Sequence, residues 1–486
     1  MRNIGLKLSF LFLALSLTVG MTGVANAMEF ADGRITINGF YKNWTGYRFG
    51  AYGHERDSGL SIFRNTIQLE ADFKVSDKAS LVAIYRLTRE PSYKLEEDAR
   101  DAGNFDSDVM DESVFREYYL AIQPTDNFWC ALGKQQVAWG DLSGIGLRVM
   151  DNINALDARW HYALDNLEDV RKPLIMSNMI YSIPSMDANL QVVWVPGLED
   201  TWERVTSVYT NPGHRYGLNN LTPGVPGRDD PSWFALGVPE DDEADPNGID
   251  RDLSDSMIGG RFQKTSGGLT WAVSALWTHN QNPGVWIDAA GLNIEYLRQA
   301  IFGFTFNWYD QWTDGVWLFE AGYFPDSPFS GNFVSLANPM PLVEEDVYKW
   351  GLRYNRNTFF HWLPHGDRRS VSSGFQVIQV VIPDNDDIDL ADDTGLGAEK
   401  TDTTGTLYLN WGMANDRVQF NMNFNYWFER RFGVALLWVD YRPQMFNGDF
   451  LITPKVILNY GRTAYSGDFG LERGNSELIL ELTYEF

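Results

Sequence analysis

The chain has 486 residues, of which 44% are apolar and 21% are charged, and its formal net charge is -26. A single cysteine excludes a disulfide-stapled scaffold and every metal or haem site built on a Cys-x-x-Cys pair. The acidic balance argues against a nucleic-acid partner, because phosphate contacts need clustered Lys and Arg. The aromatic content is high, with 18 Trp, 22 Tyr and 30 Phe.

Residues 1–27 have the pattern of a secretory signal peptide. Arg2 and Lys7 precede an apolar stretch from Leu8 to Val19, and Ala25-Asn26-Ala27 offers small residues for cleavage. A retained membrane anchor is the alternative, but the stretch is shorter than the about 20 residues that a helix needs to cross a bilayer. We therefore predict a cleaved signal and export from the cytoplasm of a Gram-negative cell.

Apolar and polar residues alternate in many segments of the remaining chain, which is the period of a strand with two different faces. From Val418 to Tyr426, apolar residues alternate with Gln and Asn, and segments 66–73 and 348–355 follow the same pattern. The apolar face ends in Trp or Tyr, whereas the other face is polar. A soluble sandwich and a transmembrane barrel would both produce this alternation, so the connections between strands must distinguish them.

The predicted connections alternate between short turns and long polar loops, as in a transmembrane barrel with both termini in the periplasm. Two connections break this rule, because 356–367 is long where a turn is expected and the turn at 429–430 is short where a loop is expected. We predict an all-β fold, a transmembrane antiparallel up-and-down β-barrel of about 16 to 18 strands. The predicted loops lie near 89–113, 141–173, 197–257, 281–293, 324–344, 383–401 and 461–475.

The final strand supports this fold independently. Leu478, Leu480, Leu482 and Tyr484 alternate with other residues up to the terminal Phe486, which resembles the signal that the outer-membrane barrel assembly machinery reads. We predict that machinery, outer-membrane lipid and lipopolysaccharide as partners, and the cell outer membrane as the location. Residues 28–486 would form one barrel domain, with an inserted loop at 141–173 and a long extracellular loop at 197–257.

A barrel of this size is wide enough to leave an aqueous lumen. The strand phase predicts which polar side chains point into it, and for each charged one a structural ion pair is the alternative to a role in permeation. The predicted lining residues are Arg64, Glu70, Asp72, Arg86, Arg116, Glu320, Lys349, Arg353, Asn421 and Asn423.

The inserted loop 141–173 carries more apolar residues than an exposed loop should, among them Val149, Met150 and Ile153. We therefore predict that it folds into the lumen and narrows it, with packing on the barrel rim as the alternative. The polar residues expected in this constriction are Asp141, Arg148, Asp151, Asn154, Asp157, Arg159 and Arg171.

Around this loop the sequence resembles a proteobacterial family of outer-membrane barrels whose function is unknown. The family pattern is a Gly-Arg-Gln strand, a Trp-Gly-acid corner and a following segment with Asn and Asp. In this chain Lys134 replaces the usual Arg, Asp141 supplies the acid, and Ala155 stands where the family has Pro. The resemblance implies outer-membrane transport of small molecules, hydrophobic ones among them, without a defined substrate.

Two acidic stretches, 240–255 and 384–393, are interpreted as solvated loops, with divalent cations bridging to lipopolysaccharide as the alternative. His361 and His365 flank a proline in an expected turn, so we predict no metal site and no cofactor. A porin-like channel is therefore the leading interpretation. The alternatives are a non-conducting barrel that serves as a partner sheath or surface platform, and a barrel hydrolase, for which no Ser-His-acid set is legible.

Overall fold

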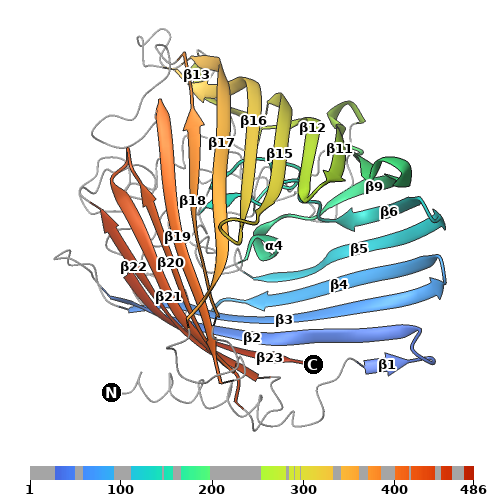
Figure 1. Cartoon of the computed structure of the whole chain (residues 1–486), viewed down its shortest axis with the longest axis vertical. Helices are drawn as coiled ribbons and strands as arrows, with labels where there is room; N and C mark the ends of the chain where they lie inside the picture. Colours follow the sequence, from blue (N-terminus) through green and yellow to red (C-terminus); the bar gives the residue numbers. More distant parts are fainter. Residues whose placement is uncertain are drawn as a thin grey trace.

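The computed structural model shows one large antiparallel sheet that closes on itself (Figure 1). Its alternating sequence explains this closure, because a sheet with one apolar and one polar face in a membrane can leave no unpaired edge. The described residues are 28–49, 59–91, 111–144, 147–156, 166–197, 253–280, 284–288, 291–295, 297–331, 341–360, 370–384, 400–414, 417–443, 450–461 and 476–486.

Eighteen strands form the barrel wall in this described part of the chain, at the upper end of the predicted range. They are β2 (Ile35–Phe49), β3 (Gly59–Ser76), β4 (Ala79–Arg89), β5 (Glu112–Thr125), β6 (Phe128–Gln135), β9 (Leu174–Ile183), β10 (Ala188–Val195), β11 (Met257–Ser266), β12 (Leu269–His279), β15 (Arg298–Asp310), β16 (Gly315–Ser330), β17 (Leu342–Phe359), β18 (Ser370–Val381), β19 (Thr401–Met413), β20 (Val418–Trp427), β21 (Phe432–Tyr441), β22 (Phe450–Gly461) and β23 (Ser476–Glu485).

Each wall strand pairs with the next one along the chain, and the first and last pair with each other. Strand β2 pairs with β23 over ten residues, from Phe40 opposite Glu485 to Phe49 opposite Ser476. Gly39 and Phe486 also exchange backbone hydrogen bonds of 2.8 and 2.9 Å. A short strand β1 (Met28–Phe30) pairs with the start of β2. The predicted closed, antiparallel, up-and-down barrel is confirmed.

The connections follow the predicted alternation at most positions. Short turns join β3 to β4 and β11 to β12, and β20 is joined to β21 by the irregular short turn 428–431. Three segments that were predicted as loops contain strands, and the one at 141–173 is described below. A small hairpin of β13 (Gly284–Asp288) and β14 (Gly291–Glu295) lies in the segment predicted near 281–293. In the segment predicted near 324–344, β16 continues to Ser330 past a bulge between Phe324 and Ser327, where Asp326 has a φ of 49°.

The two faces of each wall strand differ as the alternation predicts. In β3, Ile67 and Leu69 are 38% and 39% exposed, whereas Arg64 and Gln68 on the other face are 5% and 7% exposed. The exposed apolar face is the outer one, since the polar face contacts a segment inside the barrel. Such an outer face suits lipid, where a charge would cost roughly 2 to 4 kcal/mol at the midplane.

Some predictions lie on residues outside the described ranges. They include the signal peptide at 1–27, most of the loop 197–257, most of the acidic stretches 240–255 and 384–393, and the pair His361 and His365, so all of these stay predictions. No helix in the described part of the chain is long and apolar enough to cross a membrane.

Candidate functional site

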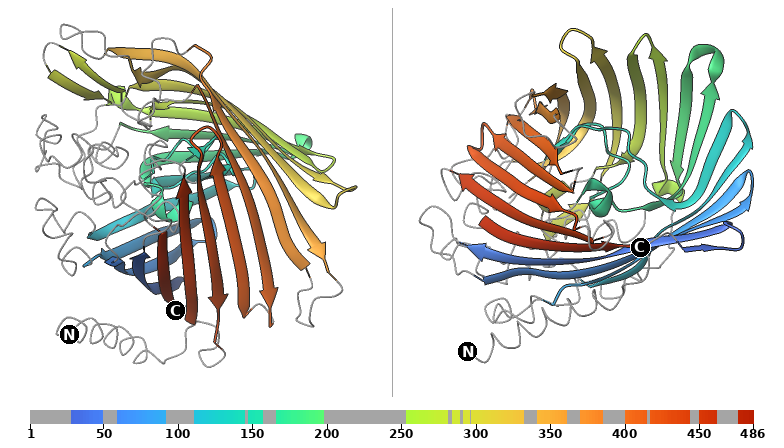
Figure 2. Two further views of the ribbon diagram at one scale, coloured as in Figure 1. Left: turned by 90° about the vertical axis from the view of Figure 1, so that its left-hand side faces the viewer. Right: turned by 60° about the horizontal axis from the view of Figure 1, so that its bottom comes forward.

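The described part of the segment between β6 and β9 leaves the wall and lies inside the barrel (Figure 2, right). We call residues 136–173 the insertion. Its described part contains two very short strands that pair with each other, β7 (Ser143–Gly144) and β8 (Leu147–Arg148). It also contains one helical turn, α4 (Leu167–Val170). Seven of its apolar residues, from Val137 to Ala155, join a buried cluster with the inner wall.

Wall glycines make room for the apolar side chains of the insertion. A Cβ atom added at Gly259 would lie 2.6 Å from the ring of Trp139, and one added at Gly351 would lie 2.8 Å from Leu142. Met150 occupies the corresponding space against Gly303. The wall strands concerned are β11, β15 and β17, so the insertion packs against one side of the lumen. Close packing without voids holds it there.

Glu320 of β16 fastens the insertion to this same side. Its carboxylate accepts hydrogen bonds from the backbone N–H of Asp141 at 2.5 Å, of Leu142 at 3.1 Å and of Met150 at 3.3 Å. Only 2% of Glu320 is exposed. Because a loop inside a barrel has no strand partner for its amides, one carboxylate satisfies three donors that would otherwise be unpaired.

Two buried contacts hold the insertion to itself. The Asp151 carboxylate lies 2.8 Å from Arg171 Nε and 3.7 Å from Arg148 Nη1. Burial lowers the pKa of Arg148 to about 10, although the neighbouring Asp151 opposes this shift. Asn154, which is fully buried, accepts a hydrogen bond from Val137 N at 2.9 Å and donates one to Lys172 O at 2.7 Å, so it ties the two ends of the insertion together.

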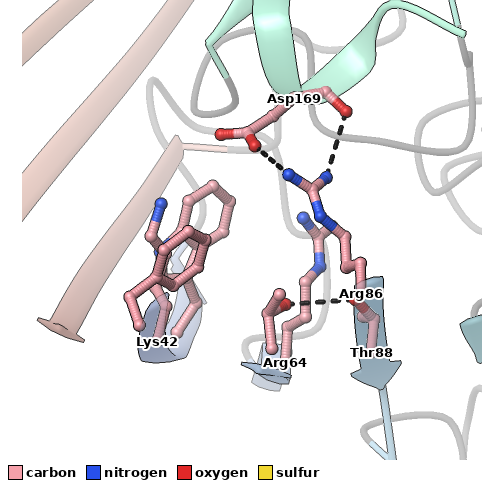
Figure 3. A pocket seen from close by; sticks show the side chains of 8 residues that line it. Lys42, Arg64, Arg86, Thr88 and Asp169 are labelled. Atoms are coloured by element: carbon pink, nitrogen blue, oxygen red, sulfur yellow. Dashed lines mark hydrogen bonds and ion pairs between the residues drawn. The ribbon is translucent and has the colours of Figure 1, made fainter. Parts of the chain in front are cut away.

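On the opposite side, two cations of the wall donate hydrogen bonds to α4 and to its C-terminal end. Arg86 of β4 donates to the carboxylate of Asp169 and to its backbone carbonyl, as Figure 3 shows. Arg116 of β5 donates to the carbonyls of Glu168 and Arg171. Burial by itself would raise the pKa of Asp169, but the nearby cations, Arg86 first, outweigh burial and hold the pKa below its ordinary value of 3.8.

The structure places all ten predicted lining residues on the inner face of the wall. Arg64, Arg86, Arg116 and Glu320 are buried there, whereas Asp72 is exposed. Lys349 lies 4.4 Å from the ring centroid of Phe324, and Arg353 donates to the carbonyl of Asp141 at 3.1 Å. The remaining three are Glu70, which accepts from Gln68, Asn421, which bonds Asn410 and Asp440, and Asn423, which accepts from Asn425.

Of the seven predicted insertion residues, Asp157 and Arg159 lie outside the described residues. Asp141, Arg148, Asp151, Asn154 and Arg171 are all in the described insertion, but four of them bind the insertion together rather than face open space. Only Asp141 is exposed.

Three further polar residues of this region were not among the predicted ones. Lys42 of β2 lies beside the rings of Phe40 and Trp44, and Asp169 of α4 binds Arg86. Gln191 of β10 accepts a hydrogen bond of 3.0 Å from the indole N–H of Trp139. The alternation of β2 carried a signal for Lys42, which shares the phase of Phe40 and Trp44. In the described part of the chain, no three His, Cys, Asp or Glu side chains gather as metal ligands would.

Comparison with solved structures identifies the barrel type. OccAB1 of Acinetobacter baumannii superposes with a TM-score of 0.50 at 9% identity, covering 95% of this chain and 98% of that one. The chain has the fold of the outer-membrane porins. The comparison also found OmpF of Salmonella typhi in complex with daunomycin (TM-score 0.44, 8% identity, 94% of this chain and 100% of that one covered) and the outer membrane channel DcaP of Acinetobacter baumannii (TM-score 0.40, 10% identity, 93% and 97% covered).

No family model and no curated protein matches the sequence. The resemblance to the uncharacterised barrel family around Lys134 and Asp141 therefore stays a prediction.

Proposed function

We propose that this chain is an outer-membrane channel for small solutes, hydrophobic ones among them, and that the insertion narrows its lumen. The porin fold supports the channel. One observation supports the constriction: the described insertion has contacts on both sides of the lumen, with Glu320 of β16 on one side and Arg86 of β4 on the other. A segment held at two opposite points of the wall must reduce the open cross-section between them.

The inner surface supports a passage for solutes that are not purely polar. A second apolar cluster of buried residues includes Trp44, Val434, Leu436, Ile457 and Ile479. The strand register places these side chains on the same face as the lumen-facing Arg64. The inner wall thus carries apolar side chains beside charged ones, a composition that suits an amphipathic solute better than a purely polar one.

Single-channel conductance of the refolded mature chain in a planar bilayer tests this proposal. We expect stable current steps, and a larger step after deletion of 144–154, because the deletion removes Val149, Met150 and Ile153, which pack in the apolar cluster inside the barrel. The matched control is a deletion of equal length, 236–246, in the predicted extracellular loop, which should leave the step unchanged.

An unchanged step after the first deletion would refute the constriction and leave the channel intact. If a correctly folded barrel carries no current at all, the channel itself is refuted, and the sheath or platform interpretation becomes the better one.

A further inference from the structure

A small pocket lies where α4 meets the wall of β2, β3 and β4 (Figure 3). Three cations, Lys42, Arg64 and Arg86, and two aromatic rings, Phe40 and Trp44, come from the wall. Asp169 closes the pocket from the side of α4. This pocket therefore combines positive charge with apolar ring surface at a point that faces the lumen.

Three cations, two of them from the pocket, lie around the ring of Trp44. The guanidinium of Arg64 lies 5.0 Å from the ring centroid of Trp44, and the ammonium groups of Lys455 and Lys42 lie 5.3 and 5.8 Å from it. Lys42 is also 5.0 Å from the ring of Phe40. Rings attract cations, but each such contact is weaker than an ion pair in a site from which water is excluded.

The three pocket cations share few carboxylates. Arg64 lies 3.8 Å from Glu90, and Arg86 is bound by Asp169. The described part of the chain supplies no ion-pair partner for Lys42, whose contacts there are with the two rings. A small anion beside Lys42 and Arg86 would gain two charged partners, because ionic hydrogen bonds are the strong ones in such a site.

With Asp169 in place, the pocket has a volume of about 20 Å³, which is room for water but not for a ring. A larger ligand must therefore displace something. The carboxylate of Asp169 is the simplest group to displace, because a ligand carboxylate would restore the same bonds to Arg86. The helical turn α4 that carries Asp169 has four residues, and Arg116 would still hold its carbonyls.

We propose that this pocket binds a small aromatic monocarboxylate, whose carboxylate takes the place of Asp169 on Arg86 and pairs with Lys42 while its ring packs on Phe40 and Trp44. The inference rests on the proposed channel and names the class of solute that it would recognise. Binding then exchanges one carboxylate for another, so it removes the side-chain contact of Asp169 with the wall and leaves the contacts of Arg116 in place.

Calorimetry on the detergent-solubilised full chain tests the proposal without any need for conduction. The probes are benzoate, its neutral analogue benzyl alcohol and the ring-less acetate. We expect benzoate to bind at least about tenfold more tightly than either, because benzyl alcohol lacks the carboxylate and acetate lacks the ring.

Variants sharpen the test. Asp169→Asn removes the competing charge at nearly constant shape and should tighten benzoate binding about tenfold, whereas Lys42→Met should weaken it about tenfold. A gain of affinity cannot result from misfolding. The control is Arg442→Gln, which removes an exposed ion pair with Glu485 at the periplasmic rim and should change nothing.

If benzoate binds no more tightly than acetate or benzyl alcohol, or if Asp169→Asn leaves its affinity unchanged, the proposal is overturned. A chain that conducts but does not bind benzoate keeps the channel and loses the pocket. A chain that binds benzoate as expected but carries no current keeps the pocket and loses the channel.

Discussion

The insertion meets the two sides of the lumen through different kinds of contact. Toward β11, β15, β16 and β17 it packs apolar side chains onto wall glycines, and Glu320 satisfies three of its amides. Toward β4 and β5 its contacts are polar, because Arg86 and Arg116 donate to it and its own Gln136 donates to Glu117 of β5. Close apolar packing leaves no space for a solute, whereas an ionic contact can be exchanged for another anion. One side should therefore fix the insertion, and the other should respond to what enters the lumen.

The largest expected effect comes from breaking the buried ion pair inside the insertion. Asp151→Ala leaves Arg148 and Arg171 without their shared carboxylate in a buried site, which should cost about 3–5 kcal/mol. We expect the insertion to loosen on both sides, with rapid protease cleavage between 141 and 173 and a larger, noisier conductance. The control Asp77→Ala removes an exposed turn pair with Lys74 and should have no effect. Protection equal to that of the parent chain would show that the pair is dispensable.

The second effect concerns the fixed side. Glu320→Leu leaves three backbone N–H groups without this acceptor and should cost about 1–3 kcal/mol for each one that stays buried and unpaired, while Glu320→Gln keeps one acceptor oxygen and should cost less. Amide hydrogen exchange of residues 141–150 measures the loss directly. We expect exchange to be faster in Glu320→Gln than in the parent chain and faster still in Glu320→Leu. Equal protection in all three chains would contradict this expectation.

The contacts of the insertion toward β4 and β5 should break more easily than those toward β16. Asp169→Asn removes one ionic contact from α4, which is worth about 1 kcal/mol for a partly exposed pair. We expect more frequent current fluctuations with unchanged thermal stability and unchanged exchange at 141–150. A fall in stability as large as that of Glu320→Leu would show that the two sides do not differ.

The smallest effect concerns pH. Because the pKa of Asp169 is held below 3.8, its pair with Arg86 contributes fully above that pH and is lost only as the pH falls through the lowered value. The other cations that face Asp169 are Lys42 and Arg116. Current fluctuations should be constant from pH 7 to about 4 and rise only below it. The Asp169→Asn chain should lack the rise, and a rise near pH 6 would assign the effect to another group.

Much of the fold was readable in the sequence because a membrane barrel repeats one rule along its length. Ile67 and Leu69 had to face lipid once Gln68 faced inward, so the alternation predicted the wall, its antiparallel order and the facing of Arg64, Arg86 and Glu320. The hydrogen-bond and ion-pair partners of those side chains could not be predicted from the sequence. Asp141 and Glu320 are 179 residues apart, and their contact depends on the curvature of the closed sheet and on where the insertion turns.

Asp169 and Lys42 illustrate the same limit. In the sequence, Asp169 is one of many acidic loop residues, and Lys42 is one polar residue in an aromatic strand. Only the fold brings them to one pocket with Arg86, because strand pairing places β2, β3 and β4 side by side and the insertion carries α4 back across them. Alternation is a local property of each strand and needs no knowledge of its neighbours, so the sequence by itself determined the barrel. The contents of the lumen result from contacts between distant segments, which only the tertiary structure decided.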